Sequence, residues 1–534
     1  MKTVFSAPRK LAGLIKFATL GAICTLPVLV SPVHAASLHF EEITEDVGPG
    51  FGDGLNRYSW SSASKDEYLY IGTFNLNFDV VQLPGYIEQI SNSDQPELAA
   101  LDAFRRLWSG SPVTPSTGGE IWRTKDGSTW EQVFKADPED VGFRKMIVYD
   151  GAIYAGTANG PNGPAPGDGA YSALPPFNPT NTVDYTGSGT ALYSSSTGES
   201  GTWQEVPGGP SSNPLNASNR AMAVIDGKLW IGTENPISGP ELWSYSTADG
   251  WTLEYQLPSG VLAIGEIEEY NGEIYFGTWA SGDGFELYQY DPDTQVATDV
   301  TPNVDADVIE GNQGVMQLYS FNGNFFLGTV NYGEGFTLLK TADPSDPNST
   351  WDVVTTDGFG SEFAGGTPDN AYAWSTQIVN DVLYLGTFNT GAEAGVLGPD
   401  IPLDGRGQLW HSTDGHTWEI LEDNGFDVPF SYGFRTMTTW NDQLVVGSAS
   451  NLFFPDLLSS PYPEYLEALA PDELEELIAY LKREGVLDLK PEDYIGTRVY
   501  VGKSKAVPEP TSAAVSLATL AALGLLRKRQ TAES

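Results

Sequence analysis

The stretch Tyr68-Leu-Tyr-Ile-Gly72-Thr73 decides the fold, because close copies of it return along the chain. Each copy is a short apolar run that ends in Gly-Thr or Gly-Ser. The marker glycines of these seven copies are Gly72, Gly156, Gly232, Gly277, Gly328, Gly386 and Gly447. Six residues before each marker glycine stands an Asp or an Asn. Those residue types tolerate a positive φ, so a tight hairpin turn is expected before every copy.

Two more short strands are expected after each marker glycine, which gives four antiparallel strands per copy. Seven such units in one chain are typical of a β-propeller. The last copy lacks a fourth strand, and the stretch 38–43 resembles the fourth strands at 129–133 and 417–421. We therefore expect residues 36–504 to form an all-β, seven-bladed β-propeller of four-stranded antiparallel blades. The N-terminal strand is expected to complete the last blade and close the ring.

Insertions interrupt this pattern after the second strands, near residues 80–118, 160–190, 391–407 and 452–493. Two of them have a helical pattern, at 95–108 and 471–485, so a few helical insertions are expected. Because all of them follow second strands, they should gather on one face of the ring. That face is either a recognition surface or ornament.

Two turns between third and fourth strands share a motif. They read Thr124-Lys-Asp126-Gly127-Ser-Thr129-Trp130 and Ser412-Thr-Asp414-Gly415-His-Thr417-Trp418. Both resemble the Asp-box of BNR-type repeats. The resemblance implies a structural staple at the outer edge, formed by Asp126, Gly127, Trp130, Asp414, Gly415 and Trp418, and not an active site.

The composition narrows the classes of function. The chain holds 27 Lys and Arg against 70 Asp and Glu, a formal net charge of −43. Such an acidic chain is a poor partner for nucleic acid or an anionic membrane. The one cysteine, Cys24, lies in the N-terminal apolar segment, so the remaining chain has no disulfide and no thiolate nucleophile. Four histidines in all are too few for a convincing zinc cluster.

Both ends of the chain carry the features of export signals. Residues 1–35 combine a basic start, an apolar run and Val33-His-Ala35, as in a secretory signal peptide, although a permanent membrane helix is the alternative. In residues 505–534, Pro508-Glu509-Pro510 precedes an apolar membrane helix and then Arg527-Lys-Arg529.

This tail resembles the PEP-CTERM sorting signal; a plain tail anchor is the alternative. The resemblance implies processing by an exosortase after signal peptidase. It also implies a place at the cell surface or in the extracellular matrix of a Gram-negative bacterium, and the form Val507-Pro-Glu-Pro-Thr511 resembles the cyanobacterial version of the signal.

Basic and aromatic residues share one position of the repeat. Twelve residues before the marker glycine stand Arg144, Arg220 and Arg435 in three copies, and Trp60 and Trp374 in two others. Equivalent positions in a ring should converge near one mouth of the central channel. Guanidinium groups suit carboxylate, sulfate or phosphate, and Trp faces suit sugar rings. The alternative is that each arginine pairs with an acid of a neighbouring blade.

No motif of a known enzyme mechanism is found: there is no Gly-x-Ser-x-Gly elbow, HExxH or phosphate loop. Acidic loops at 291–293 and 303–307 suggest Ca²⁺ only weakly and are better explained as solvated turns; no other cofactor is expected. We predict a non-catalytic binding or scaffold protein for surface glycans or another envelope component. The alternatives are an Asp-box glycoside hydrolase or lyase that acts on acidic polysaccharide, and a passive coat protein.

Overall fold

The structure is a computed structural model. It describes residues 38–75, 117–159, 189–235, 237–280, 284–309, 311–331, 333–346, 349–360, 362–363, 367–368, 370–389, 407–429, 431–450 and 496–504. All of them belong to one compact unit. The two export signals, with Pro508, Glu509 and Pro510, lie outside the described residues, as do nearly all of the four insertions and both expected helices.

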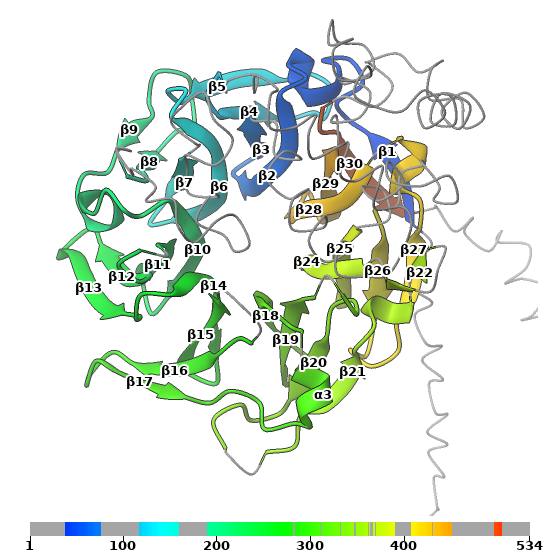
Figure 1. Ribbon diagram of the computed structural model, residues 1–534. Helices are drawn as coiled ribbons and strands as arrows, with labels where there is room; N and C mark the ends of the chain where they lie inside the picture. The colour runs from blue at the N-terminus through cyan, green and yellow to red at the C-terminus, as the bar shows by residue number, and fades with distance from the viewer. Residues whose placement is uncertain are drawn as a thin grey trace, which may run out of the picture. The chain divides into compact units, whose positions relative to one another are not determined.

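Each sequence repeat supplies four antiparallel strands that pair in order from the centre outward (Figure 1). The innermost strands are β2 (Asn56–Lys65), β6 (Asp140–Tyr149), β10 (Ser218–Ile225), β14 (Val261–Tyr270), β18 (Gly314–Phe321), β24 (Asn370–Val379) and β28 (Ser431–Trp440). The second strands are β3 (Tyr68–Asn75), β7 (Ala152–Asn159), β11 (Lys228–Glu234), β15 (Glu273–Ala280), β19 (Asn324–Val330), β25 (Val382–Asn389) and β29 (Gln443–Ser450).

The outer strands are shorter. The third strands are β4 (Glu120–Thr124), β8 (Leu192–Ser195), β12 (Glu241–Ser246), β16 (Leu287–Asp291), β20 (Leu338–Thr341), β26 (Leu409–Ser412) and β30 (Val499–Ser504). The fourth strands are β5 (Glu131–Lys135), β9 (Gln204–Glu205), β13 (Gly250–Gln256), β17 (Val296–Asp299), β21 (Asp352–Thr355), β27 (Glu419–Glu422) and, from the start of the chain, β1 (Leu38–Glu42). Besides these there are the small hairpin β22 (Glu362–Phe363) and β23 (Thr367–Pro368), and α3 (Ala306–Ile309).

The expected seven-bladed β-propeller is wrong. The strands are not divided into seven separate blades of four. The second strand of each repeat also pairs with the innermost strand of the next repeat, for example at Phe74 with Gly142 and at Trp279 with Gly314. These links join the two inner strands of all repeats into one closed barrel of 14 strands, with 14 more strands outside it, in a single 28-stranded sheet. The described residues hold almost no helix, and both expected helices lie outside them.

The marker glycines are the physical reason for these links. A Cβ added at Gly72 would lie 2.8 Å from Cβ of Phe143 in the next repeat, and one at Gly277 would lie 2.4 Å from Cβ of Val315. The other five glycines face a side chain of the following innermost strand in the same way. Without side chains at these points, neighbouring repeats approach closely enough to share a ladder.

The N-terminal strand does not close the barrel. β1 pairs with β30 along its whole length, from Leu38 opposite Ser504 to Glu42 opposite Tyr500, so it is the outer strand of the last repeat. The barrel itself closes where Tyr58 of β2 pairs with Ala449 of β29. The prediction that residues 38–43 complete the outer edge of the last repeat is confirmed, and the prediction that they close the ring is wrong.

Two other features of the repeat have clear structural causes. The Asp or Asn of every hairpin turn has a positive φ, between 44° at Asp150 and 54° at Asp66 and Asn271, as the sequence predicted. The hydroxyl after every marker glycine accepts a hydrogen bond from the backbone N–H of the residue that begins the third strand or directly precedes it, as from Glu120 to Thr73 (3.0 Å) and from Glu241 to Thr233 (2.8 Å). Each hydroxyl thus fixes the third strand onto the second.

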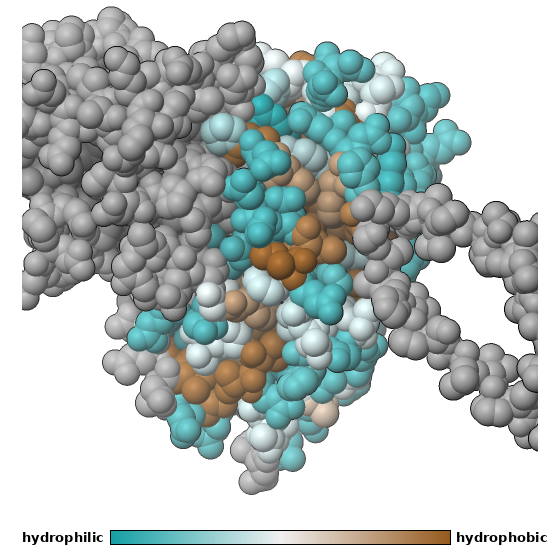
Figure 2. Space-filling model, turned by 90° about the vertical axis from the view of Figure 1, so that its right-hand side faces the viewer, coloured by the Kyte–Doolittle hydropathy of each residue, from teal (hydrophilic) through white to brown (hydrophobic). Residues whose placement is uncertain are grey.

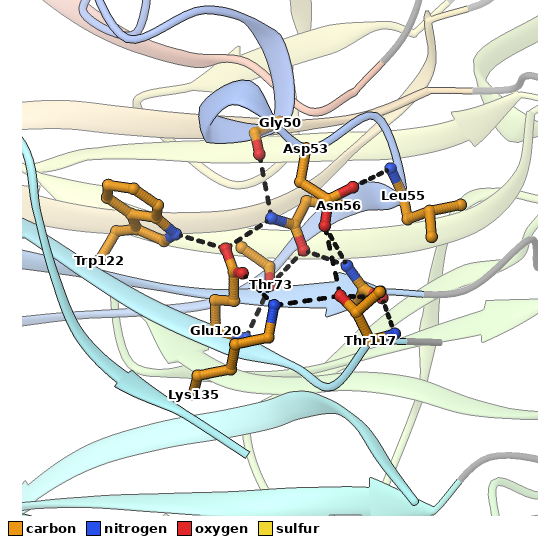
Figure 3. Close-up of polar contacts among 10 residues, drawn as sticks. Gly50, Asp53, Leu55, Asn56, Thr73, Thr117, Glu120, Trp122 and Lys135 are labelled. Carbon is orange, nitrogen blue, oxygen red and sulfur yellow. Dashed lines mark hydrogen bonds and ion pairs between the residues drawn. The ribbon is translucent and has the colours of Figure 1, made fainter. Parts of the chain in front are cut away.

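A buried asparagine fastens the start of several innermost strands. Asn56 donates to the carbonyl of Gly50 (3.0 Å) and to Glu120 (2.8 Å), and its own carbonyl accepts from Thr73 and Asn75 (both 2.9 Å) (Figure 3). Asn216 and Asn370 make matching bonds to Glu241 (2.8 Å) and Gln408 (2.6 Å). This is the end of the barrel from which the insertions leave, here called the loop face. The opposite end, with the seven Asp or Asn turns, is called the hairpin face.

The apolar core lies between the repeats and at the centre of the barrel. Both faces of a second strand are buried, so Leu69 and Ile71 pack toward the preceding repeat and Tyr70 toward the next. One further cluster, described below, draws on strands from most repeats and lies at the centre. On the side with β1 and β27, the described surface is largely hydrophilic, with apolar side chains gathered in bands (Figure 2).

Candidate functional site

A β-bulge in each innermost strand shapes the centre of the barrel. At one and the same position of all seven repeats, the pairing with the second strand skips a residue, for example between Phe143 and Lys145 and between Phe434 and Thr436. The skipped residues are Trp60, Arg144, Arg220, Gly265, Met316, Trp374 and Arg435. A bulged residue is released from the regular alternation of the strand, and its side chain is re-aimed. These are the positions that the sequence singled out as a candidate site.

The three arginines are buried, each about 6% exposed, and each lies over an indole ring. The guanidinium carbon of Arg144 is 5.0 Å from the ring centre of Trp60, and that of Arg435 is 5.7 Å from Trp374. Arg220 lies 4.0 Å over Trp279, a residue that the sequence did not single out. We call these three arginines with Trp60, Trp279 and Trp374 the axial arginine cluster. Each cation–π contact favours the charged form of its arginine.

One carboxylate serves two of the cations. Oε2 of Glu234 lies 3.4 Å from Nη1 of Arg144 and 3.5 Å from Nη1 of Arg220, and it accepts a hydrogen bond from Ser218 (3.0 Å). Arg144 and Arg220 come from neighbouring repeats, β6 and β10, so the shared acid holds them together. The alternative expected from the sequence, in which each arginine pairs with an acid of a neighbouring repeat, is confirmed for Arg144, whereas Arg220 pairs with the same acid of its own repeat.

Arg435 has a different environment. Within the described residues, no carboxylate lies within 4.0 Å of it. Burial, followed by repulsion from Arg144 and Arg220, lowers the pKa of Arg435 to about 9, and Glu266 opposes this only in part. The guanidinium is still charged at pH 7, and it lies close enough to the other two for all three cations to interact. The centre of this strongly acidic chain is therefore locally positive.

Aromatic side chains fill the axis on the loop-face side of the arginines. Tyr58 and Tyr432 share a hydrogen bond between their hydroxyl groups, and the ring of Trp374 lies 5.6 Å from that of Tyr58. Trp279 contacts Tyr372 at 5.8 Å. These residues come from four different repeats and, Trp279 apart, are almost fully buried. We call this group the aromatic plug.

Polar side chains occupy the next level toward the hairpin face. Lys145 Nζ lies 2.6 Å from Glu266 Oε2, and this ion pair joins the second and fourth repeats across the small Ala221 of the third. Hydrogen bonds also join Ser62 to Thr436 (2.7 Å) and Thr376 to Gln317 (2.9 Å). We call these six residues, Ser62, Lys145, Glu266, Gln317, Thr376 and Thr436, the polar ring.

A further carboxyl group lies beside the polar ring. Glu268 follows Glu266 by two residues on β14, so both side chains leave the same face of that strand. Burial raises the pKa of Glu268 to about 7, with a smaller contribution from the charge of Glu266, although bonds from Ser320 oppose it. The carboxyl group of Glu268 is therefore partly protonated near neutral pH.

Sequence reasoning missed Glu234 and Trp279, yet the repeat register contains the signal. Both stand two residues after a marker glycine. The seven residues at that position are Phe74, Ala158, Glu234, Trp279, Val330, Phe388 and Ala449. Glu234 is the one charged residue among them, and six of the seven belong to or pack against the central cluster. A scan of every repeat position for the exceptional residue would have found it.

The two Asp-box turns lie at the outer strands, far along the sheet from the axis. Asp126 Oδ1 accepts N–H bonds from Ser128 (2.9 Å) and Thr129 (2.7 Å), which lower the pKa of its carboxyl. Partial burial acts to raise the pKa of Asp414, but bonds from Thr417 and His416 (both 2.7 Å) lower it to about 2. Gly127 and Gly415 have positive φ, 76° and 69°. These bonds fit a role in the turns themselves.

The two tryptophans of these turns pack on neighbouring elements. Trp130 donates to the carbonyl of Ile43 (2.7 Å) and lies edge-on to Phe51, and Trp418 packs against Phe359. Each therefore ties one repeat to the chain beside it.

The acidic loop at Asp291 is a turn closed by its own bonds. Asp291 accepts from the backbone of Asp293 (2.9 Å) and from the hydroxyl of Thr294 (2.8 Å). No group of three or more metal-binding side chains occurs in the part of the chain that the structure describes. The same part contains no helix of sufficient length and apolarity to cross a membrane.

Comparison with known proteins gives only distant similarities. No family model and no curated protein matches this chain. A Trypanosoma rangeli sialidase in complex with sialic acid aligns at 12% identity over 74% of this chain and 58% of its own, with a TM-score of 0.36. A prolyl endopeptidase structure aligns at 9% over 73% and 46% (TM-score 0.37), and an α-L-arabinofuranosidase from Clostridium thermocellum at 9% over 55% and 94% (TM-score 0.28).

The chain thus spans about half the length of the first two. At these scores the similarities assign neither an activity nor a ligand to this chain.

Proposed function

We propose that this chain is an exported binding protein without catalytic activity, and that its axial arginine cluster takes an anionic group of a surface or matrix glycan. One observation carries the proposal: Arg435 is buried beside two other arginines with no described carboxylate within 4.0 Å. Burying a charge without a partner is expensive, and a bound anion would remove that cost.

The neighbours of the arginines favour a glycan over a bare ion. Trp60, Trp279 and Trp374 supply three aromatic faces around the cations. Aromatic faces pack against the apolar faces of sugar rings, and guanidinium groups bind carboxylate or sulfate through two parallel hydrogen bonds. An acidic sugar combines both chemical features.

The test is anion binding to the purified chain and to two matched variants. Arg435→Gln removes the unpaired cation. Arg123→Gln is the control, because Arg123 is equally buried and also lies over an aromatic ring, Tyr68 at 4.4 Å, but has its own partner in Glu131 at 2.9 Å. Binding is measured by calorimetry with sulfate and acetate, and then on an array of acidic and neutral glycans.

We expect Arg435→Gln to weaken anion binding by a factor of ten or more, as is usual for a lost charged hydrogen bond, and Arg123→Gln to leave it unchanged. Equal binding by wild type and Arg435→Gln would contradict the proposal.

Hydrolysis of an acidic polysaccharide is the second candidate function, and Glu266 with Glu268 favours it. Glycosidases pair an ionised carboxylate with a protonated one. Glu266 lies 2.6 Å from the ammonium group of Lys145, while burial raises the pKa of Glu268 to about 7. Release of reducing ends from uronic acid polymers, abolished in Glu268→Gln and retained in Glu254→Gln on the outer strand β13, would establish it in place of the binding function.

The cellular location is part of the same proposal and rests on the terminal segments. Export by the segment 1–35 and sorting by Pro508-Glu509-Pro510 would place the barrel at the cell surface or in the extracellular matrix. Signal peptidase and an exosortase would be the processing partners. Mass measurement of surface material that still carries Arg527–Arg529 would contradict the sorting step.

A further inference from the structure

The axial arginine cluster is unequally covered on its two sides. Toward the loop face, Tyr58 and Tyr432 are 2% and 0% exposed, and their hydroxyl groups join the adjacent first and seventh repeats. Toward the hairpin face, Ser62 and Thr376 are half-buried, and the side chain of Lys145 is 25% exposed. Among the described residues, three of the six members of the polar ring are thus partly exposed, whereas Glu266, Gln317 and Thr436 are buried; in the aromatic plug only Trp279 is partly exposed. The polar ring lies toward the face opposite to the insertions that the sequence suggested for recognition.

The polar ring on that side has the chemistry to bind hydroxyl groups. Ser62, Thr376 and Thr436 each carry a hydroxyl with one donor and two acceptor positions. Hydrogen bonds join Ser62 to Thr436 and Thr376 to Gln317, and they leave acceptor capacity in each pair. Lys145 and Glu266 add a charged donor and a charged acceptor at the same level. A bare oxyanion would use none of these acceptors.

We propose that the polar ring is the second half of the binding site, and that the ligand is an acidic sugar that enters from the hairpin face. Its anionic group reaches the axial arginine cluster, and its hydroxyl groups bind to Ser62, Thr376, Thr436 and the Lys145–Glu266 pair. This inference rests on the proposed function, because it assumes that the arginines bind an anion. It adds the class of ligand, the residues that select it and the direction of access.

Three small probes separate the two halves of the site. Glucuronate has both a carboxylate and hydroxyl groups, acetate has only the carboxylate, and glucose has only the hydroxyl groups. Each is titrated by calorimetry into the purified chain, Thr376→Val and Thr436→Val. Valine keeps the shape of threonine and removes the hydroxyl. Thr298→Val on the outer strand β17 is the control, because Thr298 is exposed and far from the axis.

We expect glucuronate to bind about tenfold more tightly than acetate, because hydrogen bonds to ligand hydroxyl groups contribute strongly to selectivity. Thr376→Val and Thr436→Val should reduce this advantage severalfold and leave acetate binding unchanged, and Thr298→Val should alter neither. If a valine variant does not fold by near-ultraviolet circular dichroism, Ser62→Ala replaces it.

Equal affinity for glucuronate and acetate would overturn this inference and leave the anion site intact. Binding of glucose as tight as that of glucuronate, or no binding of either anion, would overturn the proposed function itself.

Discussion

At the scale of one residue, Arg435 indicates a binding site because burying its charge should lower the stability of the fold. Its guanidinium is buried and stacked on Trp374, and it is repelled by Arg144 and Arg220. In a chain with 70 acidic residues, a carboxylate at this point would be easy to place. Glu234 is placed in that way between the other two arginines. The burial of this uncompensated cation supports the proposed anion site.

Arg435→Met should therefore stabilise the chain when no anion is present. Methionine keeps an apolar contact with Trp374 and removes an uncompensated buried charge, a change that often gains about 1–4 kcal/mol. Thermal unfolding in low salt should show a higher midpoint for the variant. Added sulfate should raise the midpoint of the wild type by mass action and leave that of the variant unchanged. A variant that melts earlier in low salt would instead make Arg435 a support for the aromatic plug.

Asp140 is a second exceptional residue. It stands where four other repeats have Asn56, Asn216, Asn312 and Asn370. It is buried, and burial, aided by the charges of Asp137, Glu139 and Glu205, raises the pKa of its carboxyl to about 6.

Because the folded pKa of Asp140 lies above the ordinary value of 3.8, the folded state prefers the protonated carboxyl. Stability from this group is complete below pH 4 and is lost as the pH rises through 6. Asp140→Asn should remove that loss and stabilise the chain by at most about 3 kcal/mol at pH 7.5, with little gain at pH 4. Asp137→Asn, an exposed neighbour, is the control. Equal gains at both pH values would show that charge repulsion at Asp140 is not responsible.

At the scale of the elements, the sequence repeat predicted the hairpin turns but not the contacts between neighbouring repeats. The Asp or Asn before each marker glycine was correctly assigned to a hairpin turn, because positive φ is a local property. The sequence did not explain why a glycine stands at the marker position, because the side chains that exclude a Cβ there belong to the next repeat. Phe143 and Val315 approach Gly72 and Gly277 across a junction that no local pattern shows. That missing contact is why separate blades were predicted where the structure has one continuous barrel.

Gly277→Ala tests this cause. The added methyl group would meet the buried side chain of Val315 at 2.4–2.6 Å. Overpacking of this kind typically costs about 1–3 kcal/mol. Gly333→Ala is the matched control, because the one atom near its Cβ position is 3.7 Å away. Chemical denaturation should show a loss for Gly277→Ala alone, and equal stability of the two variants would rule out close approach as the role of the marker glycine.

At the scale of the whole molecule, the candidate site exists only because the ring is closed. Arg144, Arg220 and Arg435 are far apart in sequence. Each is the bulged residue of its innermost strand, and the closed ring brings these equivalent positions to a common centre. The sequence predicted the equivalent positions. It did not predict the bulges, the shared Glu234 or the aromatic plug, because these depend on how side chains from different repeats meet.

The last prediction concerns β1, which completes the outer edge of the last repeat but takes no part in closing the barrel. Deletion of residues 38–43 would remove the ladder between β1 and β30, the contact of Phe40 with Phe426 at 5.1 Å, and the carbonyl that Trp130 binds. The expected loss in unfolding free energy is several kcal/mol, on the order of 5, from buried apolar area and lost hydrogen bonds. Because β2 still pairs with β29, the variant should retain its sheet by far-ultraviolet circular dichroism. The exposed edge of β30 should make it self-associate in size-exclusion chromatography.

The control is the double variant His39→Ala/Glu41→Ala, which changes only exposed side chains of β1. It should behave as wild type, since an exposed ion pair such as Glu41–Lys503 contributes little. A deletion variant that melts with the wild type and stays monomeric would show that β1 is dispensable to the sheet.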